Sequence, residues 1–121
     1  MKYDDSNIFA KILRGEIPCK KIYEDEFVLS FYDINPQKKV HALVIPKGKY
    51  TDLDDFSSKA SSEEMVGLLK GINTVAKQLE ISVDTGKGYR ALANISEDGG
   101  QEVPHLHFHL FGGEKIGKMV L

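Results

Sequence analysis

A chain of 121 residues, 41% of them hydrophobic and 28% charged, has the size and composition of one globular domain, which we expect to span residues 1–121. Its formal net charge of −2 argues against binding to nucleic acid through a broad basic surface. No apolar run approaches the ~20 residues of a membrane span, and the charges near the N-terminus exclude a secretory signal peptide. Because Cys19 is the only cysteine, no internal disulfide can form, which is typical of a reducing intracellular compartment. Together these features predict a cytoplasmic protein without membrane or nucleic-acid partners.

The first half of the chain predicts one short helix and three strands. Ser6 can cap the helix, and Gly15 and Pro18 end it. The apolar face of this helix consists of Ile8, Phe9, Ile12 and Leu13. Branched and aromatic residues then predict strands at 20–23, 27–33 and 40–45. Because a short turn separates the last two strands, we expect them to form an antiparallel hairpin.

The second half predicts one long helix and two further strands. Residues 47–61 are polar and mixed, with a helical turn expected around Leu53 and Phe56. Ser61 and Glu64 have the spacing of a capping box, and the helix that follows has an apolar face of Met65, Leu68, Leu69, Ile72, Val75, Ala76 and Leu79. Strands at 89–95 and 104–111 flank a polar turn. The elements predict an α+β domain with a mostly antiparallel five-stranded sheet, one long helix and one short helix.

Histidine and bulky apolar residues alternate strictly in the last predicted strand. In an extended strand, His105, His107 and His109 share one face. The opposite face, which would pack on the core, carries Leu106, Phe108 and Leu110. Since the chain has only four histidines, this clustering indicates that the segment is a candidate functional site.

A zinc site is the first interpretation of these histidines. Same-face neighbours in a strand lie about 6.7 Å apart, so the Cα atoms of His105 and His109 are separated by roughly 13 Å. Because zinc needs every ligand nitrogen within about 2.1 Å, a straight strand cannot bring all three rings to one ion. Two of them together with His41 leave a zinc site open, but we expect no metal and no cofactor.

Nucleophilic or acid–base chemistry is the second interpretation. Imidazole is substantially neutral at pH 7 and offers a lone pair without prior activation. Gly99 and Gly100 precede the strand, and their backbone N–H groups can approach a phosphate or an oxyanion closely. Three solvent-exposed histidines on an open sheet face are the alternative without function. The register of the histidines beside a Gly-Gly turn favours the functional interpretation, with His107 at the centre.

The histidine segment resembles the signature of the histidine triad (HIT) superfamily, His-x-His-x-His followed by apolar residues. Further segments are similar to the histidine triad nucleotide-binding (Hint) branch, and they span nearly the whole chain. They are Ile8-Phe9-x-Lys11-Ile12, Glu16-Ile17-Pro18, Phe31-x-Asp33-Ile34-x-Pro36-Gln37, His41-x-Leu43-Val44-Ile45-Pro46-Lys47, Gly88-Tyr89-Arg90, Asp98-Gly99-Gly100-Gln101 and Gly112-Gly113.

The resemblance implies a HIT-like fold and hydrolysis of purine nucleoside 5′-phosphoramidates, such as adenosine 5′-monophosphoramidate, to the nucleoside monophosphate and an amine. His107 would be the nucleophile, forming a covalent nucleotidyl-histidine. His109 and His41 would lie near the phosphate and leaving group, with His105 in a supporting position. The remaining matches imply ribose and base contacts from Asp33 and Ile34, phosphate-side contacts from Asn94, Gly100 and Gln101, and a base pocket of Ile8, Phe9, Ile12 and Phe31. The family is usually homodimeric.

Two departures from the family pattern concern the leaving group. Glu102 stands where many Hint proteins carry a serine that assists it, and a carboxylate there repels a phosphate unless it turns away or is protonated. A preference for a cationic amine is one expected consequence. The sequence given also stops at Leu121, without the aromatic, Pro-rich tail of some members. Two alternatives stay open: a dinucleoside polyphosphate hydrolase of a neighbouring branch, and a non-catalytic nucleotide- or zinc-binding interaction protein.

Overall fold

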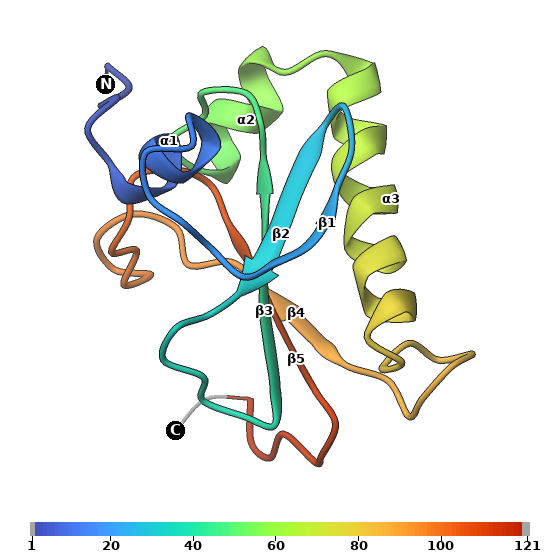
Figure 1. Cartoon of the computed structure of the whole chain (residues 1–121). Coiled ribbons are helices and arrows are strands. Elements are labelled where there is room, and N and C mark those ends of the chain that lie inside the picture. Colours follow the sequence, from blue (N-terminus) through green and yellow to red (C-terminus); the bar gives the residue numbers. More distant parts are fainter. Residues whose placement is uncertain (1, 120–121) are drawn as a thin grey trace.

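A computed structural model describes residues 2–119, and it has one five-stranded sheet with helices on both faces (Figure 1). The strands are β1 (Lys21–Glu24), β2 (Val28–Tyr32), β3 (Val40–Pro46), β4 (Arg90–Leu92) and β5 (Phe108–Gly112). Their order in the sheet is β1-β2-β3-β5-β4, and every neighbouring pair is antiparallel. The expected α+β fold with an antiparallel five-stranded sheet is therefore confirmed.

Three helices occur in the described chain, one more than expected. They are α1 (Ile8–Leu13), α2 (Leu53–Lys59) and α3 (Ser62–Gln78), and no helix among residues 2–119 is both long and apolar enough to cross a membrane. The capping box of Ser61 and Glu64 forms as predicted. The sequence predicted only a helical turn in place of α2, which Asp52 caps by accepting the N–H of Asp55.

The cap of α1 differs from the prediction. Asn7, not Ser6, is the N-cap residue, and its side chain accepts the N–H of Ala10. The Ser6 backbone and hydroxyl both donate to the side chain of Asp4 instead. Ser and Asn are equally good caps in general, so the sequence alone did not distinguish between the two neighbouring positions.

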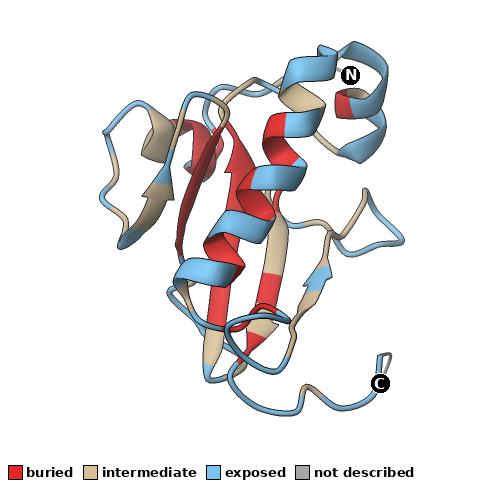
Figure 2. Cartoon of the chain, turned by 90° about the vertical axis from the view of Figure 1, so that its right-hand side faces the viewer, coloured by how far each residue is buried: buried red, intermediate tan, exposed pale blue. Residues whose placement is uncertain are grey.

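The core lies on both faces of the central strands. On one face, α3 packs its buried side on β2 and β3, as Figure 2 shows. Gly71 permits this close approach, since a Cβ there would lie 2.8 Å from Cγ2 of Val28. The other face carries a second apolar cluster of Phe9, Leu29, Phe31, Leu43 and Ile45. The central strands β2 and β3 are therefore apolar on both sides, which explains their continuous hydrophobic runs.

The histidine strand is shorter than predicted. β5 begins at Phe108, so His105 and His107 precede the sheet ladder. The backbone N–H of Leu106 donates to the carbonyl of Tyr50 rather than to a neighbouring strand. The expected alternation persists, because Leu106 and Leu110 are both buried in the core. The predicted strand at 89–95 likewise shortens to the three residues of β4.

We expect Leu110→Ala to lower the free energy of unfolding by about 3 kcal/mol, because its fully buried side chain would leave a cavity in the core. Chemical denaturation would measure the change. Leu69→Ala, at a site that is 69% exposed on α3, is the matched control and should change stability by less than about 0.5 kcal/mol. Equal losses from the two variants would contradict this description of the core.

Candidate active site

A pocket of about 600 Å³ opens on the sheet face opposite α3. Its apolar side comes from α1 and the central strands, and its polar side comes from the histidine segment and the turn after β2. All predicted site residues except His105 and Gln101 line it: Ile8, Phe9, Ile12, Phe31, Asp33, Ile34, His41, Asn94, Gly100, His107 and His109. Ile34 is 88% exposed, which places it on the rim.

His107 is held in one tautomer by the backbone. Its Nδ1 lies 2.8 Å from the carbonyl oxygen of His105, which can only accept a hydrogen bond, so Nδ1 carries the proton. Burial lowers the pKa of His107 below its ordinary value of 6.5. The ring is therefore neutral at pH 7, and the unprotonated Nε2 forms no hydrogen bond with residues 2–119. This nitrogen has a free lone pair, as a nucleophile requires.

The side chain of His105 does not line the pocket but anchors the residue whose carbonyl accepts from His107 Nδ1. Its ring is fully buried, and Nε2 lies 2.9 Å from the carbonyl oxygen of Pro46. Nδ1 is 2.5 Å from the hydroxyl of Tyr3. Because burial lowers the pKa of His105 to about 4, the ring is neutral, donates from Nε2 and accepts at Nδ1.

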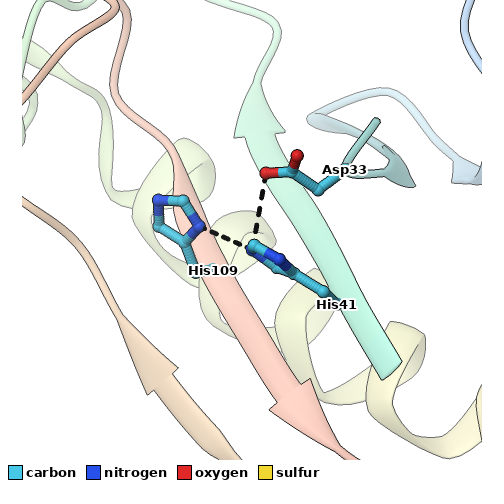
Figure 3. Close-up of side chains that lie close together, drawn as sticks. All are labelled: Asp33, His41 and His109. Atoms are coloured by element: carbon cyan, nitrogen blue, oxygen red, sulfur yellow. Dashed lines mark hydrogen bonds and ion pairs between the residues drawn. The ribbon is translucent and has the colours of Figure 1, made fainter. Parts of the chain in front are cut away.

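His41 and His109 form a second, connected pair at the polar end of the pocket (Figure 3). The β3–β5 register places Leu43 opposite His109, so His41 is its diagonal neighbour across the strands. Nε2 of His41 lies 2.9 Å from Nδ1 of His109 and 3.4 Å from Oδ2 of Asp33. This arrangement joins a carboxylate and two imidazoles in one polar contact network.

The tautomers of this pair follow from Gln37. Its backbone N–H donates to Nδ1 of His41 over 3.1 Å, so the single proton of a neutral His41 ring is on Nε2. That proton is shared with His109 Nδ1, which leaves the proton of His109 on its Nε2. Burial lowers the pKa of His41, and it lowers the pKa of His109 to about 4. We therefore assign His109 as a neutral hydrogen-bond donor through Nε2.

Asp33, His41 and His109 also have the spacing of a metal site. One ligand atom from each lies within 4.8 Å of the others. A metal on His41 Nε2, however, would have to replace the proton that the Gln37 N–H directs to that nitrogen. The donor set therefore suits a hydrogen-bonded network better than a zinc ion.

Of the two N–H groups expected to form an anion cradle, those of Gly99 and Gly100, the Gly100 group has a partner within the glycine turn. The N–H of Gly100 donates to the carbonyl of Glu97, and that of Gln101 donates to the carbonyl of Ser96, so both are occupied within the turn. Gly99 is needed for close packing, since a Cβ there would lie 2.4 Å from the carbonyl oxygen of Ile95. The side chain of Gln101 donates to the carbonyls of Thr51 and Val103. It thus ties the loops together, a different role from the expected phosphate contact.

Sequence reasoning missed two residues that this site depends on, Tyr3 and Gln37. Gln37 acts through its backbone N–H, a group that almost every residue type has, so the identity of the side chain does not reveal the contact. Tyr3 lies 102 residues from its partner His105, and no spacing rule connects positions so far apart. Both contacts come from the tertiary arrangement alone.

The comparisons with known proteins agree with this geometry. The sequence model of the HIT domain matches residues 14–116. The chain belongs to the HIT family. A HIT-like protein of Azospirillum brasilense is 52% identical over 118 residues, covering 98% of this chain and 94% of that protein.

Two other members of the HIT family carry enzyme names. Purine nucleoside phosphoramidase of Escherichia coli K12 is 40% identical over 116 residues, covering 96% of this chain and 94% of that protein. A solved structure of a HIT family hydrolase from Clostridium thermocellum superposes with a TM-score of 0.86 at 36% identity, covering 98% of this chain and 99% of that one. The family and the fold are therefore shown, and relatives include hydrolases.

We expect stability to fall as the pH drops from 6.5 to 4. His105 and His109 have folded-state pKa values of about 4, below the ordinary 6.5 of the unfolded chain, so the unfolded chain binds more protons in this window. His105 alone should contribute about 3 kcal/mol by pH 4. Urea denaturation across the range would measure the loss. His105→Gln should flatten the dependence, and an unchanged slope in that variant would contradict the assignment.

Proposed function

We propose that this protein hydrolyses purine nucleoside 5′-phosphoramidates through a covalent nucleotidyl-His107, as in the Hint branch. The observation that carries the proposal is the hydrogen bond from His107 Nδ1 to the His105 carbonyl, which leaves Nε2 unprotonated in a ring that lines the pocket. The 40% identity to a purine nucleoside phosphoramidase supports the substrate class.

The reaction has two displacements at the α-phosphorus. The His107 Nε2 lone pair forms a bond to phosphorus as the P–N bond to the leaving amine breaks, and the amine departs with a proton from solvent. The imidazole then carries a positive charge, and its Nδ1–H keeps the His105 carbonyl as acceptor. Water next attacks phosphorus, which releases the nucleoside monophosphate and restores neutral His107.

The other polar groups have roles that follow from their tautomers and positions. The Nε2–H of His109 donates a hydrogen bond to a phosphoryl oxygen and stabilises charge that develops in the transition state. His41 and Asp33 hold the His109 ring in this tautomer. The apolar side of the pocket, formed by Ile8, Phe9, Ile12 and Phe31, accommodates the purine.

The charge of the pocket favours a phosphoramidate over a dinucleoside polyphosphate. Among the described residues that line it there is no lysine or arginine, while Asp33 and Glu102 are acidic. The histidines lose their charge at pH 7 because burial lowers their pKa values. A polyphosphate chain would bring several negative charges to a site without a countercharge, whereas a phosphoramidate brings one. A non-catalytic protein with the same pocket would bind the nucleotide without hydrolysing it.

We also propose a homodimer, the usual state of the branch that the sequence resembles. β4 ends the sheet, and its outer edge pairs with no strand of the described chain. An antiparallel second copy of β4 would satisfy those backbone groups and continue the sheet.

We expect His107→Asn to abolish turnover of adenosine 5′-phosphoramidate, measured as released AMP, because it removes the attacking nitrogen. Intact mass spectrometry should detect a nucleotidyl adduct in the parent during turnover and none in the variant. Lys87→Ala, at an exposed position outside the pocket, should keep the activity. Hydrolysis by His107→Asn at the parental rate would refute the nucleophile. Nucleotide binding that the substitution leaves unchanged, with no hydrolysis by the parent, would support the non-catalytic alternative.

We expect Glu102→Gln to raise kcat/KM for a diadenosine polyphosphate about fivefold, because it removes a carboxylate from the pocket wall. The same change should lower the preference for phosphoramidates whose amine carries a second, cationic group. Glu97→Gln is the matched control, since Glu97 is exposed in the same turn but does not line the pocket. Equal effects of the two substitutions, measured with both substrates, would show that only net charge matters.

A further inference from the structure

We propose that Tyr3 is a positioning residue for His107 and acts through the His105 ring. The chain of contacts runs from the Tyr3 hydroxyl to His105 Nδ1 over 2.5 Å, and from the His105 carbonyl to His107 Nδ1 over 2.8 Å. The effect of Tyr3 on catalysis rests on the proposed function. Its effect on the His107 tautomer does not, and it can be measured without substrate.

The His105 carbonyl needs an anchor because the sheet does not hold it. Residues 103–107 lie outside the ladder, which begins at Phe108. The backbone N–H of His105 reaches only Val103, two residues away, and the next tie to a distant segment is Leu106 N–H to the carbonyl of Tyr50. The His105 carbonyl and the Leu106 N–H belong to one planar peptide, so the bond to Tyr50 restrains this peptide on its N–H side. The contacts of the His105 side chain restrain it on the carbonyl side.

The two nitrogens of the His105 ring each have one hydrogen-bond partner, and the chemistry of the partners determines which nitrogen donates and which accepts. The Pro46 carbonyl can only accept, so His105 Nε2 donates to it over 2.9 Å. The neutral ring then has a lone pair at Nδ1, and the Tyr3 hydroxyl donates to it. The edge of one aromatic ring also meets the face of the other, with centroids 5.6 Å apart. Without Tyr3, the buried Nδ1 would have no hydrogen-bond partner among the described residues.

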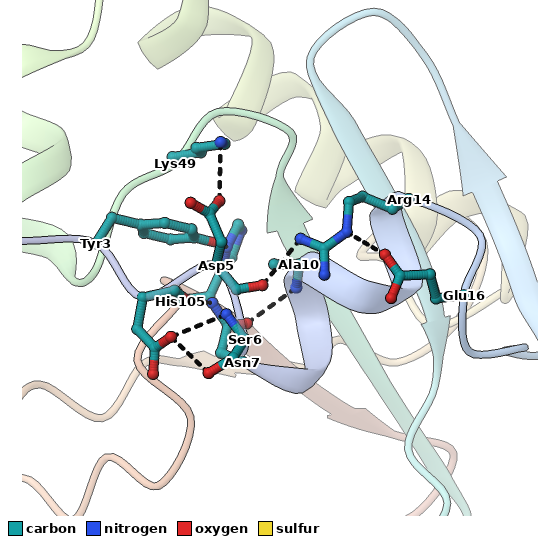
Figure 4. A network of polar contacts seen from close by, with 10 residues as sticks. Tyr3, Asp5, Ser6, Asn7, Ala10, Arg14, Glu16, Lys49 and His105 are labelled. Carbon is teal, nitrogen blue, oxygen red and sulfur yellow. Dashed lines mark hydrogen bonds and ion pairs between the residues drawn. The ribbon is translucent and has the colours of Figure 1, made fainter.

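The segment that carries Tyr3 forms several polar contacts near His105, as Figure 4 shows. Two residues further on, Asp5 forms an ion pair of 2.8 Å with Lys49, in the segment that follows β3. Its backbone carbonyl accepts a hydrogen bond of 2.8 Å from Arg14, and Asn7 then caps α1. The segment before α1 is thus tied to the protein at several points, and Tyr3 is the residue in it that reaches the histidines.

The test is Tyr3→Phe, which keeps the aromatic ring and removes only the hydroxyl donor. Nitrogen-15 NMR of the imidazoles reports which nitrogen of each histidine is protonated. In the parent, His107 should be protonated at Nδ1, and the Tyr3 hydroxyl proton should give a slowly exchanging signal close to His105. In the variant, the fraction of His107 protonated at Nε2 should rise. Turnover of adenosine 5′-phosphoramidate should lose roughly 10- to 100-fold in kcat with KM unchanged.

Tyr23→Phe is the matched control, because it removes a hydroxyl that donates to Asp25 outside the pocket, and Asp5→Asn tests the ion pair separately from the Tyr3 hydroxyl. Both should leave the His107 tautomer as in the parent, because Asp5→Asn keeps the Arg14 bond to the backbone carbonyl of residue 5 and the Asn7 cap, which also tie the segment that carries Tyr3. A Tyr3→Phe protein with parental nitrogen shifts at His107 and parental kcat would overturn the inference. So would a parent without the protected Tyr3 hydroxyl signal, a measurement that requires no variant to fold. A tautomer change in a protein without phosphoramidase activity would retain the positioning role and refute the proposed function.

Discussion

The hydrogen bond between His107 Nδ1–H and the His105 carbonyl controls the chemistry that the pocket can perform. An imidazole can be protonated on either nitrogen, and only one of the two tautomers presents a lone pair at Nε2. A backbone carbonyl decides between them without adding charge, whereas a carboxylate would raise the pKa of the ring. The orientation of a single peptide in the segment before β5 therefore determines whether this side chain can act as a nucleophile.

A second consequence is a pocket whose polar groups are largely uncharged. Burial holds all four imidazoles neutral at pH 7, so they contribute oriented N–H groups and lone pairs instead of positive charge. Such a site stabilises charge that forms during reaction, because its dipoles are already in place. The same burial makes the fold sensitive to pH, since protonation of these rings in mildly acidic solution favours the unfolded chain.

The sheet supplies the rigid part of the site. β2 and β3 are covered on both faces, by α3 on one side and by the second apolar cluster on the other. His41 and His109 lie on β3 and β5, where backbone pairing fixes their separation. His105 and His107 precede the ladder, and their segment is tied to distant parts of the chain by the Leu106 bond to Tyr50 and by the contacts of the His105 ring. One polar network is thus held by the sheet and the other by loops, which is why Tyr3 matters to only one of them.

Apolar spacing was enough to predict the long helix, the central strands and the burial of Leu106 and Leu110, because the burial of one face is a local property of helices and strands. The order of the histidines in the chain likewise indicated the chemistry and the family. The position of each imidazole proton was not predictable in this way. Tyr3, Gln37 and the Pro46 carbonyl reach the histidines across long sequence separations or through backbone atoms. Hydrogen-bond partners of that kind are set by how the chain folds back on itself, and no local pattern of side chains encodes them.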